Sequence, residues 1–346
     1  MASTLTRENV DTIGSWEADE VTVGQVEKAL SDLRRHEQRA AVRTSVLTLV
    51  AVVGDDAAGS AALDTVYGLG ARHPSRTIVL VLQPGEANGG LDAAASVHAV
   101  ERAGRAVCFE DIVLRVRGRA RYHLDSVVEP FTLPDLPMVV WLPSRLPEAG
   151  DPLLAVADRI VVDSRAVAGA RGASAAASGV NRDVLPRIQA LARRLPVTDL
   201  SWARLAPWRS LLAGLFEGPV YRPFLREVER VDVSGNYGPR HLLGGWLMRR
   251  LNLPAARLEL AEAEHVSITI TAVHRNRTGV FRVARPGAAR EIASSVEIDQ
   301  GPSVSQTLRM QQQWPALALA GALTQMGRDD IFCDALEGAV ALAAIS

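Results

Sequence analysis

The sequence has little of what marks several large classes of protein. The 346 residues carry 38 basic and 39 acidic side chains, so the formal net charge of -1 favours neither nucleic acid nor an anionic membrane surface. Cys108 and Cys333 are the two cysteines, which are too few for a disulfide framework and lack the spacing of a structural zinc site. Because so few cysteines are typical of a reducing compartment, we expect a cytoplasmic protein.

Long apolar runs are also missing. Residues 1–20 contain several acidic side chains and no apolar core of an export signal, and we expect them to form a disordered tail. No later segment offers the roughly 18 uncharged apolar residues that a membrane-spanning helix requires. The sequence therefore predicts no membrane anchor and no membrane partner.

Common catalytic and cofactor motifs are absent as well. The first apolar run is followed by Gly54-Asp55-Asp56 instead of the GxGxxG that a dinucleotide needs beside a helix N-terminus. There is no GxSxG turn, phosphate-binding GxxxxGK[ST] loop or HExxH pair, and the seven histidines are scattered. We therefore predict a protein that binds a partner and is not an enzyme, with no catalytic residue, cofactor or metal.

What is present first is a series of short apolar runs, each bounded by glycine, proline or charged residues. Such runs are typical of buried strands, and they occupy residues 46–53, 78–82, 138–142 and 160–162. Apolar residues at helical spacing predict helices at 23–36, after a Thr22–Gln25 capping box, and at 57–72. Alternation of apolar and polar residues predicts strands exposed on one face at 94–100 and 112–116. We predict an N-terminal α/β domain, residues 21–175, with a parallel or mixed sheet flanked by helices.

A second domain is expected after residue 175, because alanine, serine and glycine dominate residues 166–179 and the chain exceeds the size of a usual single core. Residues 176–346 contain helical and partly alternating segments. Helices are predicted at 184–191, 244–251, 314–326 and 331–344, and strands at 228–233, 258–260, 266–270 and 280–283. This pattern predicts a smaller α+β domain with an antiparallel sheet.

Three residues near the predicted N-terminal strands are candidate contacts. Arg76 precedes an apolar strand and can form bidentate pairs with a carboxylate or phosphate, although an internal salt bridge is the simpler interpretation. Asp135 can close the turn between Pro134 and Pro137, and Trp141 lies at the end of the following strand, where a cleft wall can form.

The segment 199–216, DLSWARLAPWRSLLAGLF, has the clearest internal pattern. Pro207 suits a first helical position, and an apolar stripe follows at helical spacing, which predicts core packing for Trp208. Trp202 and Arg204 fall in the stretch before this helix, which we expect to be extended. Because tryptophan and arginine concentrate binding energy at interfaces, Trp202, Arg204 and the adjacent Arg209 are candidate partner contacts.

Five motifs in a fixed order resemble the glucose-6-phosphate dehydrogenase assembly protein family (OpcA). They are HPSRTIVLVL at 73–82, LPDLPMVVWLP at 133–143, DRIVVDS at 158–164, the segment 199–216 and GGWLMRRL at 244–251. The resemblance implies a non-catalytic effector that binds glucose-6-phosphate dehydrogenase and promotes its active form, and thereby NADPH supply in the oxidative pentose phosphate pathway. Some members of this family are associated with thiol redox control. We do not expect this property here, because both cysteines of this chain lie in apolar surroundings.

A different class of function stays open at this point. An α/β sheet with arginine beside it can bind a small anion, so the chain is alternatively a sugar-phosphate- or nucleotide-binding sensor or enzyme with a site near Arg76 and Trp141. This alternative depends on analogy at the level of the fold.

Overall fold

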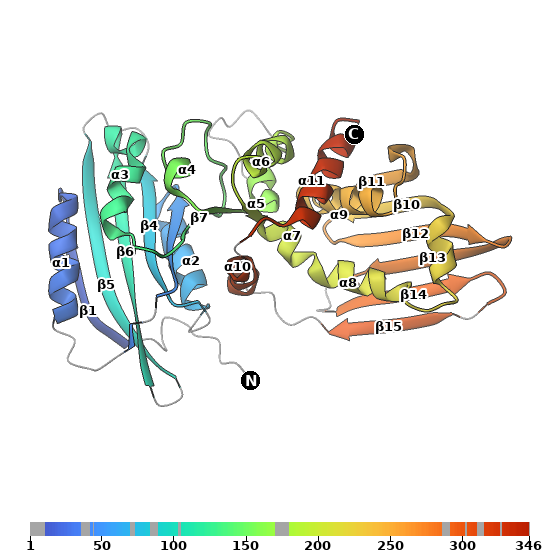
Figure 1. The fold of residues 1–346 in the computed structure, drawn as a ribbon, viewed down its shortest axis with the longest axis horizontal. Coiled ribbons are helices and arrows are strands. Elements are labelled where there is room, and N and C mark those ends of the chain that lie inside the picture. The colour runs from blue at the N-terminus through green and yellow to red at the C-terminus, as the bar shows by residue number, and fades with distance from the viewer. Residues whose placement is uncertain are drawn as a thin grey trace. The chain divides into compact units, whose positions relative to one another are not determined.

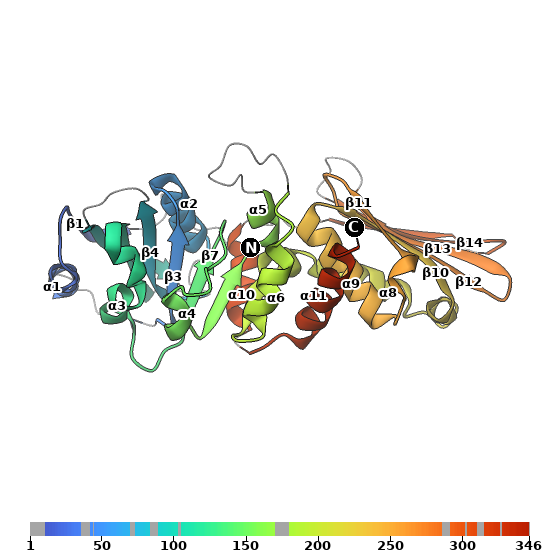
Figure 2. The same ribbon diagram turned by 90° about the horizontal axis from the view of Figure 1, so that it is seen from above.

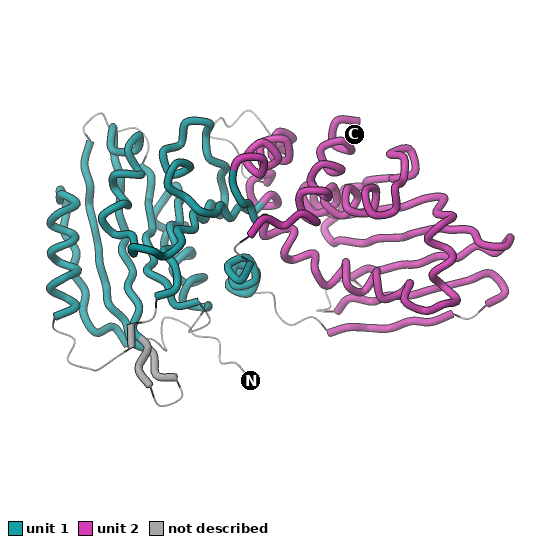
Figure 3. The backbone as a smooth tube through the Cα atoms, viewed as in Figure 1, with its two compact units in different colours: residues 1–163, 195–198, 314–326 teal, residues 164–194, 199–313, 327–346 magenta. Residues whose placement is uncertain are grey.

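The chain forms two compact units in a computed structural model. The structure describes residues 11–35, 42–43, 45–69, 73–83, 89–102, 105–169, 180–285, 291–301, 303–309, 315–325 and 327–345. Unit 1 contains Met1–Asp163, Leu195–Thr198 and Trp314–Met326, and unit 2 contains Ser164–Arg194, Asp199–Gln313 and Gly327–Ser346 (Figure 3). The chain therefore passes between the units several times.

Unit 1 is built on a mixed sheet with the strand order β1-β5-β6-β4-β3-β7-β8-β9, in which β2 also pairs with β6 (Figure 1). The central strands β6, β4, β3, β7 and β8 are parallel neighbours, whereas β5 runs antiparallel to both β6 and β1. The bounds are β1 Asp11–Ala18, β2 Val42–Arg43, β3 Leu47–Val53, β4 Ser75–Gln83, β5 Gly90–Arg102, β6 Arg105–Arg117, β7 Met138–Leu142, β8 Arg159–Val162 and β9 Val197–Asp199.

The apolar runs of the sequence predict the centre of this sheet well. Every residue of β3, β7 and β8 is buried, because parallel strands are covered on both faces. The predicted mixed or parallel sheet flanked by helices is confirmed. The helices of unit 1 are α1 Val23–Arg35, α2 Asp56–Tyr67, α3 Leu124–Val128, α4 Leu153–Val156 and α10 Pro315–Thr324, with short 3-10 turns η3 Gly118–Tyr122 and η4 Glu129–Phe131.

The N-terminal segment differs from the prediction. Residues 1–10 lie outside the described residues, but 11–18 form strand β1, so a disordered tail to residue 20 is wrong there. Seven residues of β1 pair with β5, and this pairing satisfies backbone groups in a strand whose own side chains are half-buried or exposed. The capping box that starts α1 is confirmed, since Thr22 N donates to Gln25 Oε1 at 2.8 Å.

Unit 2 contains a six-stranded sheet with the order β11-β10-β12-β13-β14-β15. The neighbours are antiparallel except β10 and β11, which run parallel, so the predicted antiparallel sheet is confirmed with this addition. The strands are β10 Val228–Gly235, β11 Leu258–Glu262, β12 Ser267–His274, β13 Arg277–Ala284, β14 Glu291–Ile298 and β15 Val304–Arg309. Burial alternates along β12 and β14, as expected for a sheet with one covered face.

Helices cover one face of the unit 2 sheet. Figure 2 shows α8 and α9 on the same side of the sheet, and α8 contacts β13 and β14 while α9 contacts β10 and β11. The elements are α5 Ser164–Gly169, α6 Val184–Ala192, α7 Leu200–Arg204, α8 Ala206–Leu215, α9 Tyr237–Arg250 and α11 Asp330–Ala343, with η5 Arg222–Arg226 and η6 Ala255–Arg257. Helix α9 starts seven residues before the predicted start at 244.

Glycines allow α9 and α11 to cross with their backbones in contact. A Cβ on Gly338 would lie 2.6 Å from the carbonyl oxygen of Gly245, and a Cβ on Gly245 would collide with the backbone of Ala335 and Ala339. Overpacking of that kind destabilises a core, so only glycine fits at this crossing. Among the residues that the structure describes, no helix is both long and apolar enough to cross a membrane.

Candidate functional site

The tryptophan-arginine segment forms two consecutive helices, α7 and α8. The side chain of Asp199 caps α7, because its Oδ1 accepts hydrogen bonds from the backbone N–H groups of Ser201 at 2.8 Å and Ser164 at 3.0 Å. Helix α8 follows at once, with Pro207 in its first turn. The extended conformation predicted for Trp202 and Arg204 is therefore wrong, since the Asp199 cap starts a helix there.

Trp202 lies in the interior of unit 2. Its side chain is 3% exposed, and its indole Nε1 donates to Asp329 Oδ2 at 3.1 Å. Its ring centroid lies 6.0 Å from that of Phe332. The same Asp329 caps helix α11 by accepting from the backbone N–H of Phe332 at 2.9 Å. Trp202 therefore joins α7 to the start of α11 instead of presenting its ring on the surface.

Arg209 packs its guanidinium over the Trp202 ring, 3.3 Å from the ring centroid. Burial removes water from this cation and lowers the pKa of Arg209 to about 10, while the negative charge of Asp329 acts in the opposite direction. The side chain remains positive at neutral pH. A cation over a tryptophan face is a stabilising arrangement, so Arg209 braces α8 against α7.

The other two residues of this segment differ in exposure. Arg204 is half-buried at the end of α7. Trp208 is 6% exposed, as predicted for a core position, and no hydrogen-bond partner for its indole nitrogen lies among the described residues. Trp202 and Trp208 are thus both buried, although the sequence predicted burial for Trp208 alone.

Arg76 is committed to internal contacts in unit 1. Its Nε donates to Glu110 Oε2 at 3.0 Å, and a terminal nitrogen donates to the carbonyl oxygen of Phe131 at 2.9 Å. The other Glu110 oxygen accepts from Arg34 Nε at 2.6 Å. The carboxylate of Glu110 therefore joins the start of β4 to α1, and the salt-bridge interpretation of Arg76 is confirmed.

The structure separates Arg76 from Trp141. Arg76 lies on β4 and Trp141 on β7, and both strands pair with β3. Arg76 is level with Thr48 of β3, and Trp141 is level with Ala51. Arg76 thus lies near the start of β4, while Trp141 lies towards the end of β7 and is 4% exposed. An anion site built from both residues at one edge of the sheet does not form.

Asp135 occupies an exposed turn before β7. Its φ of 63° lies in the left-handed region, which aspartate tolerates better than most residues. The backbone N–H of Leu136 donates to the carbonyl oxygen of Leu133 at 3.2 Å and closes the turn. The predicted role of Asp135 in turn formation is confirmed, and its side chain is exposed to solvent.

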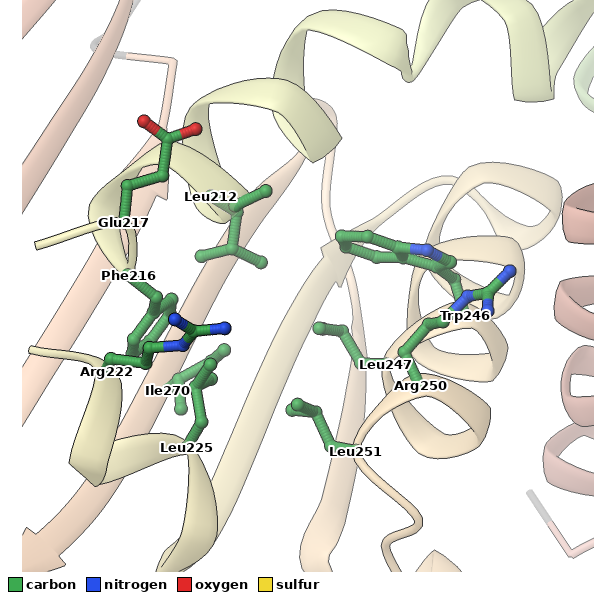
Figure 4. Close-up of a pocket in the computed structure, with 11 residues that line it drawn as sticks. Leu212, Phe216, Glu217, Arg222, Leu225, Trp246, Leu247, Arg250, Leu251 and Ile270 are labelled. Carbon is green, nitrogen blue, oxygen red and sulfur yellow. The ribbon is translucent and has the colours of Figure 1, made fainter.

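Two grooves flank helix α8, and no sequence pattern indicated either of them. The first has a volume of about 380 Å³ and lies between α8, η5 and the C-terminal half of α9 (Figure 4). Residues from α8 and η5 face residues from α9 across it. It is lined by Leu212, Ala213, Phe216, Glu217, Arg222, Leu225, Trp246, Leu247, Arg250, Leu251 and Ile270. The second, of about 450 Å³, lies between the other side of α8 and β15.

A buried polar network in unit 1 was also missed, because its members are distant in sequence. Tyr67 Oη donates to Asp111 Oδ2 at 2.7 Å, and His98 Nε2 lies 2.9 Å from Asp111 Oδ1. The second ring nitrogen of His98 lies 3.2 Å from Thr12 Oγ1. These groups satisfy one another inside the fold. Among the described residues, no group of three or more His, Cys, Asp or Glu side chains could hold a metal ion.

Comparison with known proteins agrees with the motif order. Two family models, described as the N-terminal domain and the C-terminal domain of a "Glucose-6-phosphate dehydrogenase subunit", match residues 68–178 and 195–336 respectively. The chain is 30% identical over 206 residues to a "Putative OxPP cycle protein OpcA" of Synechocystis sp., and 27% identical over 190 residues to a protein of that name from Nostoc punctiforme. The aligned regions span 57% and 52% of this chain, but 40% and 38% of those relatives.

Proposed function

The chain belongs to the OpcA family of glucose-6-phosphate dehydrogenase assembly proteins, and we propose that it binds this dehydrogenase and promotes its active form. Through that effect it supports NADPH production in the oxidative pentose phosphate pathway. The observation that supports the proposal most strongly is that two family models match successive parts of the chain, residues 68–178 and 195–336, and that the descriptions of both name this dehydrogenase.

The proposed action needs no chemistry by the chain itself. A binding protein shifts a partner's equilibrium when it has a higher affinity for one state, and the shift equals the difference in binding free energy. A tenfold change in the ratio of active to inactive dehydrogenase requires a difference of about 1.4 kcal/mol between the two affinities. We therefore propose a non-catalytic effector that acts in the cytoplasm, as the few cysteines favour.

Two of the residues proposed as partner contacts retain suitable positions. Asp135 lies on an exposed turn, and Arg204 is half-buried at the end of α7. Trp202 and Arg209 are better suited to hold α7 and α8 in place, because the ring of one is buried beneath the guanidinium of the other. We extend no contact role to Arg76 or Trp141.

Complex formation is the direct test of this proposal. The purified chain and the purified cognate glucose-6-phosphate dehydrogenase are mixed at about 10 μM, a concentration at which micromolar affinities populate a complex, and separated by size with light scattering. We expect a species whose mass contains both proteins. Two separate peaks at the masses of the free proteins would contradict the proposal.

The domain limits 21–175 and 176–346 stay a proposal about independent folding. The composition of the alanine- and serine-rich stretch 166–179 predicts a linker, and we expect a protease to cut there first, after helix α5 ends at Gly169. Limited proteolysis followed by mass measurement of the fragments checks this limit. Primary cleavage within 228–274, inside the sheet of unit 2, would contradict it.

A further inference from the structure

The groove between α8 and α9 has a floor and walls of apolar side chains. Leu212 of α8, Phe216 directly after α8 and Leu225 of η5 form one wall, and Leu247 and Leu251 form the other (Figure 4). Ile270 of β12 lies beneath them and is 1% exposed. We call this hollow the α8–α9 groove.

Charged groups of the α8–α9 groove are confined to Glu217, Arg222 and Arg250, which are all exposed. A sugar phosphate or a nucleotide carries many polar atoms, and burying them on an apolar floor costs free energy unless each finds a partner. An apolar side chain loses no hydrogen bonds there. The lining therefore favours an apolar group over a polar metabolite.

The charge at the rim is asymmetric. The guanidinium of Arg222 has no ion-pair partner among the described residues, and Arg250 reaches Asp334 only at 3.9 Å. Glu217 is the single anion that lines the groove. Because Asp334 partly compensates Arg250, the cation that attracts an approaching carboxylate most strongly is Arg222, and charge complementarity there favours an acidic residue of the partner.

Trp246 adds an aromatic side chain at the edge of the α8–α9 groove. Its side chain is half-buried on α9, and Figure 4 shows the indole beside the guanidinium of Arg250 at the margin of the groove. Tryptophan and arginine are enriched where interfaces concentrate their binding energy, and a partner ring can pack against both. The groove beside β15 is lined by Ser210 and Gln306 and has only Glu217 as a charged residue, so it lacks this combination.

We propose that the α8–α9 groove is a docking site for one large apolar side chain of glucose-6-phosphate dehydrogenase, carried on a segment with a neighbouring carboxylate that pairs with Arg222. The apolar side chain enters between Phe216 and Leu251, against Trp246. This inference rests on the proposed function, because it names the chemistry by which the partner is recognised.

Filling the groove tests the apolar part of the proposal without removing a core contact. Ala213 lines the groove and is exposed, so Ala213→Trp places a ring in the space that the partner would occupy. Ala256→Trp, at an exposed position outside the groove, is the matched control. Affinity for the purified dehydrogenase is measured by calorimetry, and we expect Ala213→Trp to weaken it about tenfold or more while Ala256→Trp leaves it unchanged.

Reversing one charge tests the acidic part. Arg222→Glu and Arg226→Glu change the net charge equally and lie on the same short helix η5, but only Arg222 lines the groove. We expect Arg222→Glu to weaken binding about fivefold at low salt and less at high salt, and Arg226→Glu to have a much smaller effect. Thermal unfolding of each variant confirms that the fold is intact.

The outcomes separate the docking site from the function itself. Weaker binding by Ala213→Trp and Arg222→Glu, with parental affinity of both controls, supports the site. If the original chain binds and activates the dehydrogenase and both groove variants do so equally well, the site is wrong and the proposed function stands. If the original chain itself neither binds nor activates, the proposed function is wrong and the docking site is wrong with it.

Discussion

The guanidinium of Arg209 lies 3.3 Å from the centroid of the Trp202 ring, and the indole nitrogen of Trp202 donates to Asp329 at the start of α11. This stack connects α7, α8 and α11 and holds α8, which borders the α8–α9 groove. Trp202 is therefore a structural residue. Its loss should affect the α8–α9 groove indirectly, because it removes a contact that holds α8 in place.

We predict that Trp202→Ala and Trp208→Ala each lower the free energy of unfolding by about 3 to 5 kcal/mol, because each removes a buried aromatic side chain. Chemical denaturation followed by circular dichroism measures this. A Trp202→Ala variant as stable as the original chain would contradict the buried position and restore a role for Trp202 as an exposed contact.

The Trp202 result also shows where the sequence was insufficient. Helical spacing predicted the burial of Trp208 and the face of α8, because both depend on neighbours within two turns. The burial of Trp202 depends on Asp329, which lies 127 positions away. No local pattern contains that information.

The backbone contact between α9 and α11 gives a second prediction. Gly245→Ala should lower the free energy of unfolding by about 1 to 3 kcal/mol or more, because the new methyl group meets the backbone of Ala335 and Ala339. Gly214→Ala, in α8 with open space around the added group, should instead stabilise by about 0.5 to 1 kcal/mol through helix propensity. Equal effects of the two changes would contradict the close crossing.

The GGWLMRRL motif is explained in part by this crossing. The sequence contains the two glycines without a visible reason for them. Gly245 meets the backbone of α11, and Gly244 meets the side chains of Leu260 and Leu342, which are all distant in sequence. In contrast, β7 was predicted to the residue, because a strand buried on both faces appears as an unbroken apolar run. Strands β14 and β15 were missed. The apolar alternation of β14 is interrupted by the buried Ser294, and every residue of β15 is exposed, so that β15 forms a strand through its pairing with β14.

Acid sensitivity is predicted from His241. This residue is fully buried, its Nδ1 lies 2.7 Å from the carbonyl oxygen of Tyr237, and burial lowers its pKa from 6.5 to about 4. Between these two values the unfolded chain binds a proton that the folded chain does not. The free energy of unfolding should therefore fall as pH decreases from about 6.5 to about 4, by an amount on the order of 3 kcal/mol.

The control for this effect is His241→Gln, which cannot titrate. The unfolding free energy of the original chain minus that of this variant should decrease as pH falls from about 6.5 to about 4, whichever of the two proteins is the more stable. Urea unfolding at several pH values measures both curves. A constant difference across that range would show that His241 does not carry the linkage.

A fourth prediction concerns the thiol of Cys333. Burial raises the pKa of Cys333, although the nearby Arg328 acts in the opposite direction. The reactive thiolate is therefore scarce at neutral pH, and alkylation should be slower than for an unhindered cysteine peptide and accelerate at alkaline pH. Iodoacetamide labelling with mass detection checks this. Labelling at neutral pH as fast as that of the peptide would contradict the prediction and reopen a redox role.

The central claim is that this chain raises the activity of glucose-6-phosphate dehydrogenase by binding it. The most direct test is to titrate the purified chain into the cognate dehydrogenase at subsaturating glucose 6-phosphate and to follow NADPH formation. We predict a rate that rises with the concentration of the chain and saturates, with no NADPH formed by the chain alone. A rate that stays constant through concentrations well above those of the enzyme would contradict the claim.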